Sequence, residues 1–179
     1  MTYAIDPSHS LIEFSVKHMM VSTVKGRFDK YNGEVEIDEA NPVASKVNVT
    51  IETASINTNA EQRDGHLRSA DFFDAEKYPT ITFVSKKVQP LGGEKYLVTG
   101  DLTLHGVTRE IPLEITREGV TTNMQGQNLQ AFSASLAISR KEYGLEWNVA
   151  LESGGWLVSD QVKISLEVQA VAKAAQAIA

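Results

Sequence analysis

Apolar and polar residues alternate over long stretches of this chain, and this alternation constrains the fold more than any other feature. Successive side chains of a β-strand point to opposite faces, so each alternating stretch predicts a strand with one buried face. The clearest stretches are residues 9–17, 46–52, 108–117, 129–139 and 161–170. With the shorter stretches between them we count eight or nine strands, most of them joined by short turns. This order is typical of an antiparallel barrel or sandwich.

The length of the strands favours the barrel. Strands of about 9–11 residues run roughly 30 Å, which is long for a packed sandwich. A barrel of about eight such strands can hold one ligand along its axis. We therefore predict an all-β fold with one short helical insert, an antiparallel eight-stranded barrel formed by a single domain over residues 1–170. The remaining residues, 171–179, form an alanine-rich tail that could be a frayed helix.

Two local patterns add detail to the predicted sheet. Asn32-Gly33 lies between two strand-like stretches, which predicts a tight hairpin turn. In the strand at 129–139, one face carries only small residues after Leu129. A face that borders a ligand cavity needs no bulk, so we expect this face to point inward. The alternative is that a large neighbour such as Trp147 or Trp156 packs against it.

One segment, at about residues 59–78, breaks the alternation. Leu67, Ala70 and Phe73 (or Phe72) recur at the spacing of one helical face, and Pro79 ends the helical pattern. A single charged helix between runs of strands has to cover something. We expect it to cover an open end or flank of the barrel.

Composition excludes several classes of protein. The 179-residue chain has a net charge of −6, which argues against a nucleic-acid partner. No stretch approaches the roughly 18–20 apolar residues of a membrane-spanning helix, so no integral membrane segment is expected. Residues 1–6 lack the features of a signal peptide. The sequence as written predicts a cytoplasmic protein, or a periplasmic or secreted one if a leader has been removed.

Catalytic and metal-binding motifs are absent. There is no cysteine, no Gly-x-Ser-x-Gly elbow, no phosphate-binding loop and no dinucleotide fingerprint. The four histidines, His9, His18, His66 and His105, are scattered without the spacing of a metal site. We predict no catalytic residues, no metal and no cofactor. The alternative is an enzyme that acts on a lipid or quinone-like substrate with His66 or His18 as the acid or base.

Charged residues of the helical segment have two interpretations. They could form local ion pairs, or Arg63, His66 and Arg68 could hold the anionic or polar head of a ligand at the cavity mouth, since arginine offers forked donors. Candidate residues that line the cavity are Phe14, Val16, His18, Met19, Phe28, Leu67, Phe72, Phe83, Phe132 and Trp147.

Several motifs together resemble one known family. They are Tyr3-x-Ile-Asp-x-x-His-Ser-x-Ile-x-Phe14, Arg63-Asp-x-His-Leu-Arg-Ser-x-Asp-Phe-Phe-Asp74, Tyr78-Pro-x-Ile-x-Phe83, Gly100-Asp-Leu-Thr-Leu-His-Gly-Val-Thr108 and Val162-Lys-Ile. In combination they identify the chain as similar to the YceI family of lipid-binding proteins over residues 3–170.

The resemblance implies a lipocalin-like barrel whose elongated apolar interior holds a long-chain isoprenoid lipid, and a homodimer. It implies no settled catalytic activity. Many members of the family carry a secretion leader and work in the periplasm. The expected function is therefore to bind, carry or store a polyprenyl lipid or an isoprenoid quinone.

Overall fold

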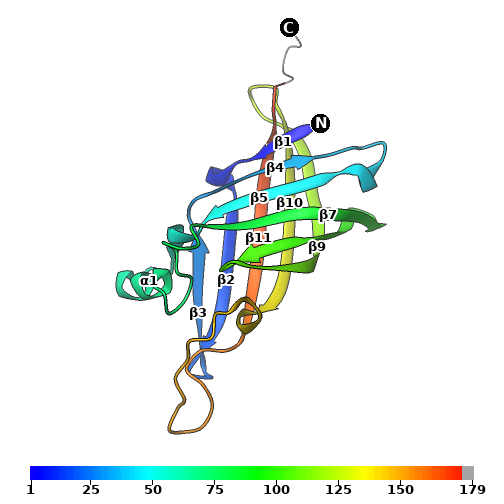
Figure 1. Ribbon diagram of the computed structural model, residues 1–179. Coiled ribbons are helices and arrows are strands. Elements are labelled where there is room, and N and C mark those ends of the chain that lie inside the picture. The colour runs from blue at the N-terminus through cyan, green and yellow to red at the C-terminus, as the bar shows by residue number, and fades with distance from the viewer. Residues whose placement is uncertain (175–179) are drawn as a thin grey trace.

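The structure is a computed structural model that describes residues 1–174, and one antiparallel sheet of eleven strands makes up most of it (Figure 1). The strands are β1 (Thr2–Ile5), β2 (Leu11–His18), β3 (Ser22–Phe28), β4 (Tyr31–Glu36), β5 (Lys46–Glu52), β6 (Ile56–Asn57), β7 (Thr80–Gly92), β8 (Lys95–Leu104), β9 (Val107–Thr122), β10 (Asn128–Ser139) and β11 (Gln161–Ala172). The described residues also form one α-helix, α1 (Glu61–Arg68), and the short 3-10 helices η1 (Pro7–His9), η2 (Pro42–Ala44), η3 (Thr53–Ser55) and η4 (Arg140–Tyr143). Because α1 has only eight residues, it is too short to cross a membrane.

Eight of the strands close into a barrel. Their order is β1-β4-β5-β7-β8-β9-β10-β11, and pairing of β1 with β11 joins the two ends. The predicted eight-stranded antiparallel barrel is confirmed. Strands β2, β3 and β6 continue the sheet beyond the barrel, because the first half of β11 pairs with β2 and its last residues pair with β1.

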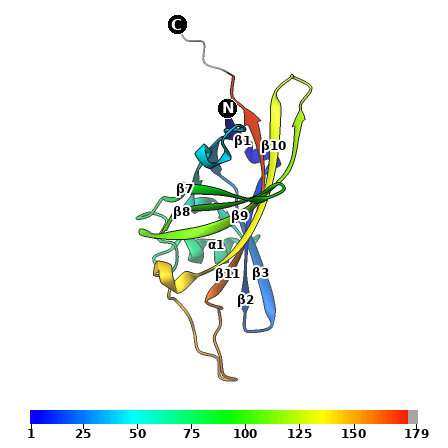
Figure 2. The same ribbon diagram turned by 90° about the vertical axis from the view of Figure 1, so that its right-hand side faces the viewer.

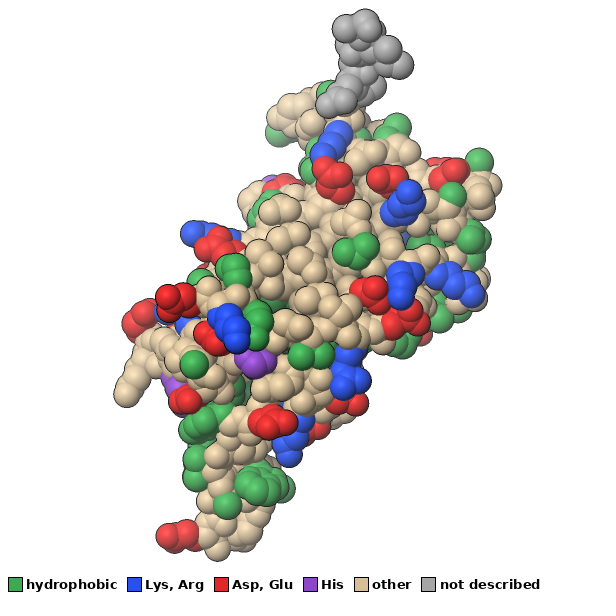
Figure 3. Space-filling model, viewed as in Figure 1, with side chains coloured by type: hydrophobic (Ala, Val, Ile, Leu, Met, Phe, Trp, Pro, Cys, Tyr) green, Lys and Arg blue, Asp and Glu red, His purple; other side chains and the backbone are tan. Residues whose placement is uncertain are grey.

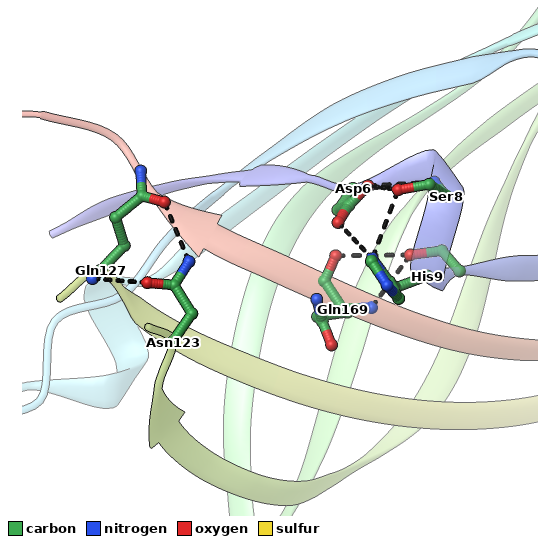
Figure 4. A network of polar contacts seen from close by, with 7 residues as sticks. Asp6, Ser8, His9, Asn123, Gln127 and Gln169 are labelled. Atoms are coloured by element: carbon green, nitrogen blue, oxygen red, sulfur yellow. Dashed lines mark hydrogen bonds and ion pairs between the residues drawn. The ribbon is translucent and has the colours of Figure 1, made fainter. Parts of the chain in front are cut away.

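The change of partner along β11 depends on a small polar network between β1 and β2 (Figure 4). Asp6 caps η1: its Oδ1 accepts a hydrogen bond from the Ser8 backbone N–H at 3.0 Å, and its Oδ2 lies 2.7 Å from Nδ1 of His9. Ser10 Oγ then accepts from the backbone N–H of Gln169 at 3.0 Å. These bonds hold the chain against β11 where it passes from one strand to the next.

The wall of the barrel opens between β9 and β10. Their pairing ends at Ile115 and Ala134, although the same register would place Ile111 opposite Ile138. Pro112 lies in the part of β9 that pairs with β8 but not with β10, and proline has no backbone N–H to donate to a neighbouring strand. The two strands therefore separate where a proline makes a continuous ladder impossible.

The helix is shorter than the sequence predicts. It ends at Arg68, and the chain continues in turns up to β7. Ser69 follows the helix in an extended conformation and its Oγ donates to the backbone oxygen of His66 at 2.6 Å. Asp74 has a positive φ of 47°, which is incompatible with a continuing helix. The apolar residues after Arg68 are therefore presented by turns.

The hairpin predicted at Asn32-Gly33 is wrong. Both residues lie inside β4, and β3 and β4 are separated by Asp29 and Lys30. Glycine is required at position 33 for space: a Cβ there would come within 2.7 Å of Ile5 Cδ1 and 2.8 Å of a backbone oxygen of β5. The glycine signals a close approach of neighbouring groups and not a turn.

The small-residue face of β10 also points the other way from the prediction. Its bulky face, with Phe132, Leu136 and Ile138, lines the interior, whereas Ser135 and Ala137 are exposed outside. The barrel is wide enough to leave space beside large side chains, so small ones are not needed there.

The tail begins as strand. Val171 and Ala172 belong to β11, because they pair with Ala4 and Tyr3 of β1. Residues 175–179 of the predicted tail lie outside the described residues.

Replacing Asp6 tests the junction between β1 and β2. Hydrogen bonds from Ser8 and then His9 lower the pKa of the Asp6 carboxyl below its ordinary value, so this group stabilises the fold above its unfolded pKa. We expect Asp6→Asn to lower the free energy of unfolding at pH 7 by about 1 kcal/mol, the usual cost of a lost cap. The difference from the wild type should begin to shrink as pH falls below about 4, the ordinary pKa of the unfolded carboxyl, and should vanish once pH passes below the lowered pKa of the folded state. Urea unfolding across pH measures this; a difference that grows in acid would contradict it.

Candidate functional site

A central cavity of about 440 Å³ runs inside the barrel. β5 passes along it and contributes Val47, Val49 and Ile51, and β11 contributes a matching row of apolar side chains opposite. The polar side chains of the lining gather where these strands end. The cavity therefore has an apolar middle and two polar ends, which we call the α1 end and the Arg117 end.

Aromatic side chains narrow the α1 end. Trp147 packs edge-on against His66, with ring centroids 4.8 Å apart, and lies 5.1 Å from Phe72. His66 Nε2 lies 2.9 Å from Oδ2 of Asp71, which fixes the orientation of the imidazole ring. Phe28 packs deeper against Phe14 and Phe73. Two distant segments, α1 with its following turn and the loop after β10, thus meet across this end.

Arg63 is fixed in place at the same end. Its Nε donates to Thr58 Oγ1 at 2.7 Å, and its Nη2 donates to the Thr58 backbone oxygen at 2.8 Å. Thr58 is in turn held by buried Asp64, whose Oδ1 accepts from the Thr58 backbone N–H at 2.9 Å. Arg63 is exposed and borders the cavity, and among residues 1–174 it forms no direct ion pair. Its remaining N–H donors are available to a ligand.

An ion pair borders the Arg117 end. Both Nη atoms of Arg117 donate to Glu39, at 3.2 and 2.9 Å, and Nε lies 3.7 Å from a carboxylate oxygen of Glu94. Burial opposes the charge of Arg117, yet hydrogen bonding and attraction from Glu39 raise its pKa above the ordinary value. This end is therefore bordered by a side chain that stays cationic and is already paired.

Arg140 is buried beside the cavity and serves a structural role. Its guanidinium donates to four backbone oxygens of the loop at 144–159, at distances of 2.6–3.3 Å. The acceptors belong to Leu145, Trp147, Val158 and Ser159. Burial lowers the pKa of Arg140, and attraction from Asp160 opposes that shift. Arg140 therefore holds in place the loop that carries Trp147.

A second, more polar recess of about 410 Å³ lies outside the barrel, at the opening between β9 and β10. Ile111 and Ile138 line both this recess and the central cavity, so their side chains separate the two. Arg109 borders the recess, as does Tyr143, a buried residue whose hydroxyl has no hydrogen-bond partner in the part of the chain that the structure describes. Burial raises the pKa of that hydroxyl. At this opening β9 and β10 are not hydrogen-bonded to each other, so the side chains of Ile111 and Ile138 alone form the wall between the cavity and the recess.

The structure brings most of the predicted site residues to the cavity. Those that line it are Phe14, Val16, His18, Phe28, Leu67, Phe72, Phe83, Phe132 and Trp147, with Arg63 and His66 from the predicted head-group set. Met19 and Arg68 do not line it. Met19 lies in the turn between β2 and β3 with half of its surface exposed. Arg68 points away, donating to the backbone oxygen of Ala54 at 3.0 Å.

Sequence reasoning missed the positions of Thr58 and Arg117 beside the cavity and the structural role of Arg140. The partner of Arg117, Glu39, is 78 positions away, and Arg140 is held by backbone oxygens that no sequence pattern marks. The spacing of Thr58 ahead of Arg63 and Asp64 is the one usable signal, because it lies at the start of the helical segment. Among residues 1–174, no three His, Asp or Glu side chains gather where they could hold a metal ion.

Comparison with known proteins agrees with this architecture. The model of the YceI-like domain matches residues 3–170. The chain belongs to the YceI family. A UPF0312 protein of Staphylococcus aureus is 39% identical over 168 residues, which cover 93% of this chain and 95% of the relative.

Solved structures extend the YceI comparison to three dimensions. A YceI protein of Campylobacter jejuni is 35% identical, with a TM-score of 0.77 over 88% of this chain and 90% of that one. BcnA of Burkholderia cenocepacia is 29% identical, with the same score over 92% and 98%. A polyisoprenoid binding domain from Saccharophagus degradans, implicated in plant cell wall breakdown, is 23% identical with a TM-score of 0.70 over 96% and 98%, and shows the shared fold.

Two of the YceI motifs form α1 and a turn that contacts η4. Arg63-Asp-x-His-Leu-Arg-Ser forms α1 and its cap. His105-Gly106 forms the turn between β8 and β9, with positive φ values of 53° and 72°. His105 Nδ1 lies 3.0 Å from the backbone oxygen of Tyr143, and its ring packs on Tyr78. This YceI turn thereby connects the barrel to η4.

Removing the Arg140 side chain tests its structural role. Arg140→Ala leaves four backbone oxygens without their donor, so we expect the free energy of unfolding to fall by about 3 kcal/mol. Arg109→Ala is the matched control, since exposed Arg109 makes one hydrogen bond, to the Glu142 backbone oxygen at 2.8 Å. It should change stability by less than about 0.5 kcal/mol. Urea unfolding measures both, and equal losses would contradict the role assigned to Arg140.

Proposed function

We propose that this YceI protein binds, and so carries or stores, one long-chain isoprenoid-type lipid, either a polyprenyl lipid or an isoprenoid quinone. The observation that carries the proposal is the central cavity of about 440 Å³, whose middle is lined by apolar side chains of the barrel strands. Ligand cavities of proteins usually measure about 300–1,000 Å³ and bury most of the ligand. A slender hydrocarbon lying along the barrel axis fits this shape.

Burial of a hydrocarbon supplies enough free energy for tight binding. Each buried methylene contributes about 0.8 kcal/mol, so twenty of them give roughly 16 kcal/mol before costs. Ordering the chain and losing its free motion subtract several kcal/mol. The apolar middle of the cavity therefore needs no polar contact to hold a tail, and we expect it to accept tails of similar width.

The relatives support this ligand class without deciding it. One structural neighbour carries the name of a polyisoprenoid binding domain, and it shares the fold of this chain. Because this chain shares the fold and has an apolar cavity, binding of an isoprenoid lipid in that cavity is the function that we consider best supported. The homodimer that the resemblance implies stays a prediction, and sedimentation velocity measures it.

The alternative, an enzyme acting on a lipid or quinone-like substrate, is favoured by one observation. His66 and Asp71 form a pair 2.9 Å apart beside the cavity, an arrangement that can orient an acid or base. Against it, the aromatic neighbours of His66 account for its position as part of the narrow α1 end. A lipid-binding role accounts both for the cavity and for the His66–Asp71 pair, which orients His66 beside the cavity.

Mass spectrometry of the purified protein after incubation with a polyprenol tests the proposal. We expect one lipid per chain, recovered with its mass unchanged. An altered lipid mass would favour the enzyme. Failure to retain any long-chain lipid would refute the binding function.

Filling the cavity tests where the tail lies. Ala134 lines the apolar middle of the cavity, and its neighbour Ser135 is exposed on the outer face of the same strand. Ala134→Trp should weaken binding of a long prenol at least tenfold, because the indole occupies the path of the tail. Ser135→Trp adds the same side chain outside and should leave the affinity unchanged. Equal affinities of both variants, measured by competition with a fluorescent fatty acid, would place the tail elsewhere.

The polar head is proposed to lie at the α1 end, against Arg63 and His66. Arg63→Ala should weaken a prenyl pyrophosphate about tenfold more than the corresponding prenol, because the guanidinium attracts the charged head. Arg68→Ala is the matched control, since Arg68 points away from the cavity and should affect both lipids equally. Equal losses for both lipids in Arg63→Ala would remove this arginine from the head-group site.

A further inference from the structure

Exposed apolar side chains gather at one end of the molecule. They come from the turn between β2 and β3, residues 19–21, and from the loop at 144–159, which we together call the tip. Exposed fractions are 50% for Met19, 65% for Met20, 81% for Val21, 46% for Val149 and 54% for Trp156. Figure 3 shows hydrophobic side chains concentrated over this lower end of the molecule.

The two parts of the tip are joined by backbone contacts. The Met19 backbone N–H donates to the Leu157 oxygen at 2.8 Å, and the Ser159 N–H donates to the Lys17 oxygen at 3.0 Å. Met20 packs on Gly155, where an added Cβ would come within 2.6 Å of its sulfur. The two parts of the tip therefore form one connected surface, on which the apolar side chains lie close together.

The backbone of the turn is unusual for the residues it carries. Met19 and Met20 have positive φ values of 51° and 65°, and the Val21 N–H donates to the His18 oxygen at 3.3 Å. Two central residues with positive φ are typical of a type I′ turn, for which Asn-Gly is strongly preferred. Backbone strain of this kind clusters at functional sites. Here it presents two large apolar side chains to the surroundings.

The shape and chemistry of the tip fit a lipid bilayer. The tip projects beyond the barrel as an extended end of the molecule (Figure 2). Trp156 lies under the Lys141 amino group, 5.8 Å from the ring centroid. Such a pair of an amphipathic ring and a cation suits the boundary between head groups and acyl chains.

Charge and position agree with a membrane contact. The exposed charges on and beside the tip balance, with Lys17, Lys25 and Lys141 against Glu142, Glu146 and Glu152, in a chain with a net charge of −6. An anionic membrane would repel the tip less than the rest of the surface. The tip also adjoins the α1 end of the cavity, because Trp147, Leu157, Val158 and His18 line that cavity.

We propose that the tip docks on a lipid bilayer by inserting Met19, Met20, Val21 and Trp156 into the boundary between head groups and acyl chains. This rests on the proposed function for its purpose, which is to bring the α1 end of the cavity to the membrane where a prenyl lipid is exchanged. The docking contact itself depends only on the tip.

The double substitution Met19→Asn with Met20→Gly tests the proposal. Asn-Gly suits the turn, so the variant should fold with an unchanged or higher melting temperature. We expect its partitioning onto phosphatidylcholine vesicles to fall about tenfold or more, since apolar burial drives such binding. Met124→Asn is the matched control, because Met124 is 98% exposed in the β9–β10 turn at the opposite end of the molecule. Its partitioning should equal that of the wild type. Vesicle flotation measures all three proteins.

Trp156 supplies a second readout. Its fluorescence should be quenched by vesicles that contain brominated acyl chains, in the wild type and far less in the double variant. Absence of vesicle binding by the wild type, or equal binding by the wild type and the double variant, would overturn the proposal. Self-association without vesicles that the double substitution abolishes would also overturn it, by assigning the tip to a second copy of the chain.

Docking and lipid binding fail independently. A prenol supplied from solvent, with no vesicles present, should bind the double variant as tightly as the wild type, whereas transfer of prenol out of vesicles should slow by about the same factor as vesicle binding falls. If the wild type docks on vesicles but retains no prenol, the docking proposal is supported and the proposed lipid-binding function is refuted. If the double variant takes prenol from vesicles as fast as the wild type, docking has no part in exchange and the proposal is overturned.

Discussion

Closure of the sheet is the constraint on which the rest of the structure depends. β1 pairs with β4 on one side and with β11 on the other, so the barrel has no free edge at this junction. Backbone hydrogen bonds hold the strands at a fixed separation, and the interior does not have to be filled to keep the barrel open. The short polar junction at Asp6 allows one strand, β11, to serve both the barrel and the β2–β3 extension. The cavity is a consequence of this closure.

The two ends of the cavity differ in how they are built. At the Arg117 end, a paired arginine and two glutamates meet beside the turn between β7 and β8. At the α1 end, Trp147 of the loop after β10 packs through its side chain on His66 and Phe72, which belong to α1 and its following turn. Contacts of that kind part at lower cost than a backbone ladder. The proposed head-group site and the proposed docking surface therefore lie at the same end of the barrel.

Alternation of side chains was enough to predict the barrel and several of the strand residues that line it, because strand faces follow a period of two whatever the distant partners are. It could not tell which face of β10 points inward, since Ser135 and Leu136 follow the same period. Asn32-Gly33 has the composition of a turn, yet Gly33 is needed because Ile5 and β5 come close to it. Pro112 did carry a usable signal, because a proline inside a predicted strand indicates an edge.

The polar residues were harder to predict. Arg63 and Arg68 are both on α1, and only contacts with Thr58 and Ala54 separate the one that borders the cavity from the one that does not. Arg140 and Arg117 depend on partners far along the chain or on backbone oxygens, which leave no local pattern. Met19 was expected inside because it is apolar, whereas the turn directs it to the surface.

An electron density map of crystals grown with a prenol tests the central claim most directly. The account predicts one continuous chain of density along the barrel axis, between His66 at one end and Arg117 at the other, in contact with the apolar lining. A cavity filled with ordered water, or density for the prenol only on the outer surface, would contradict it.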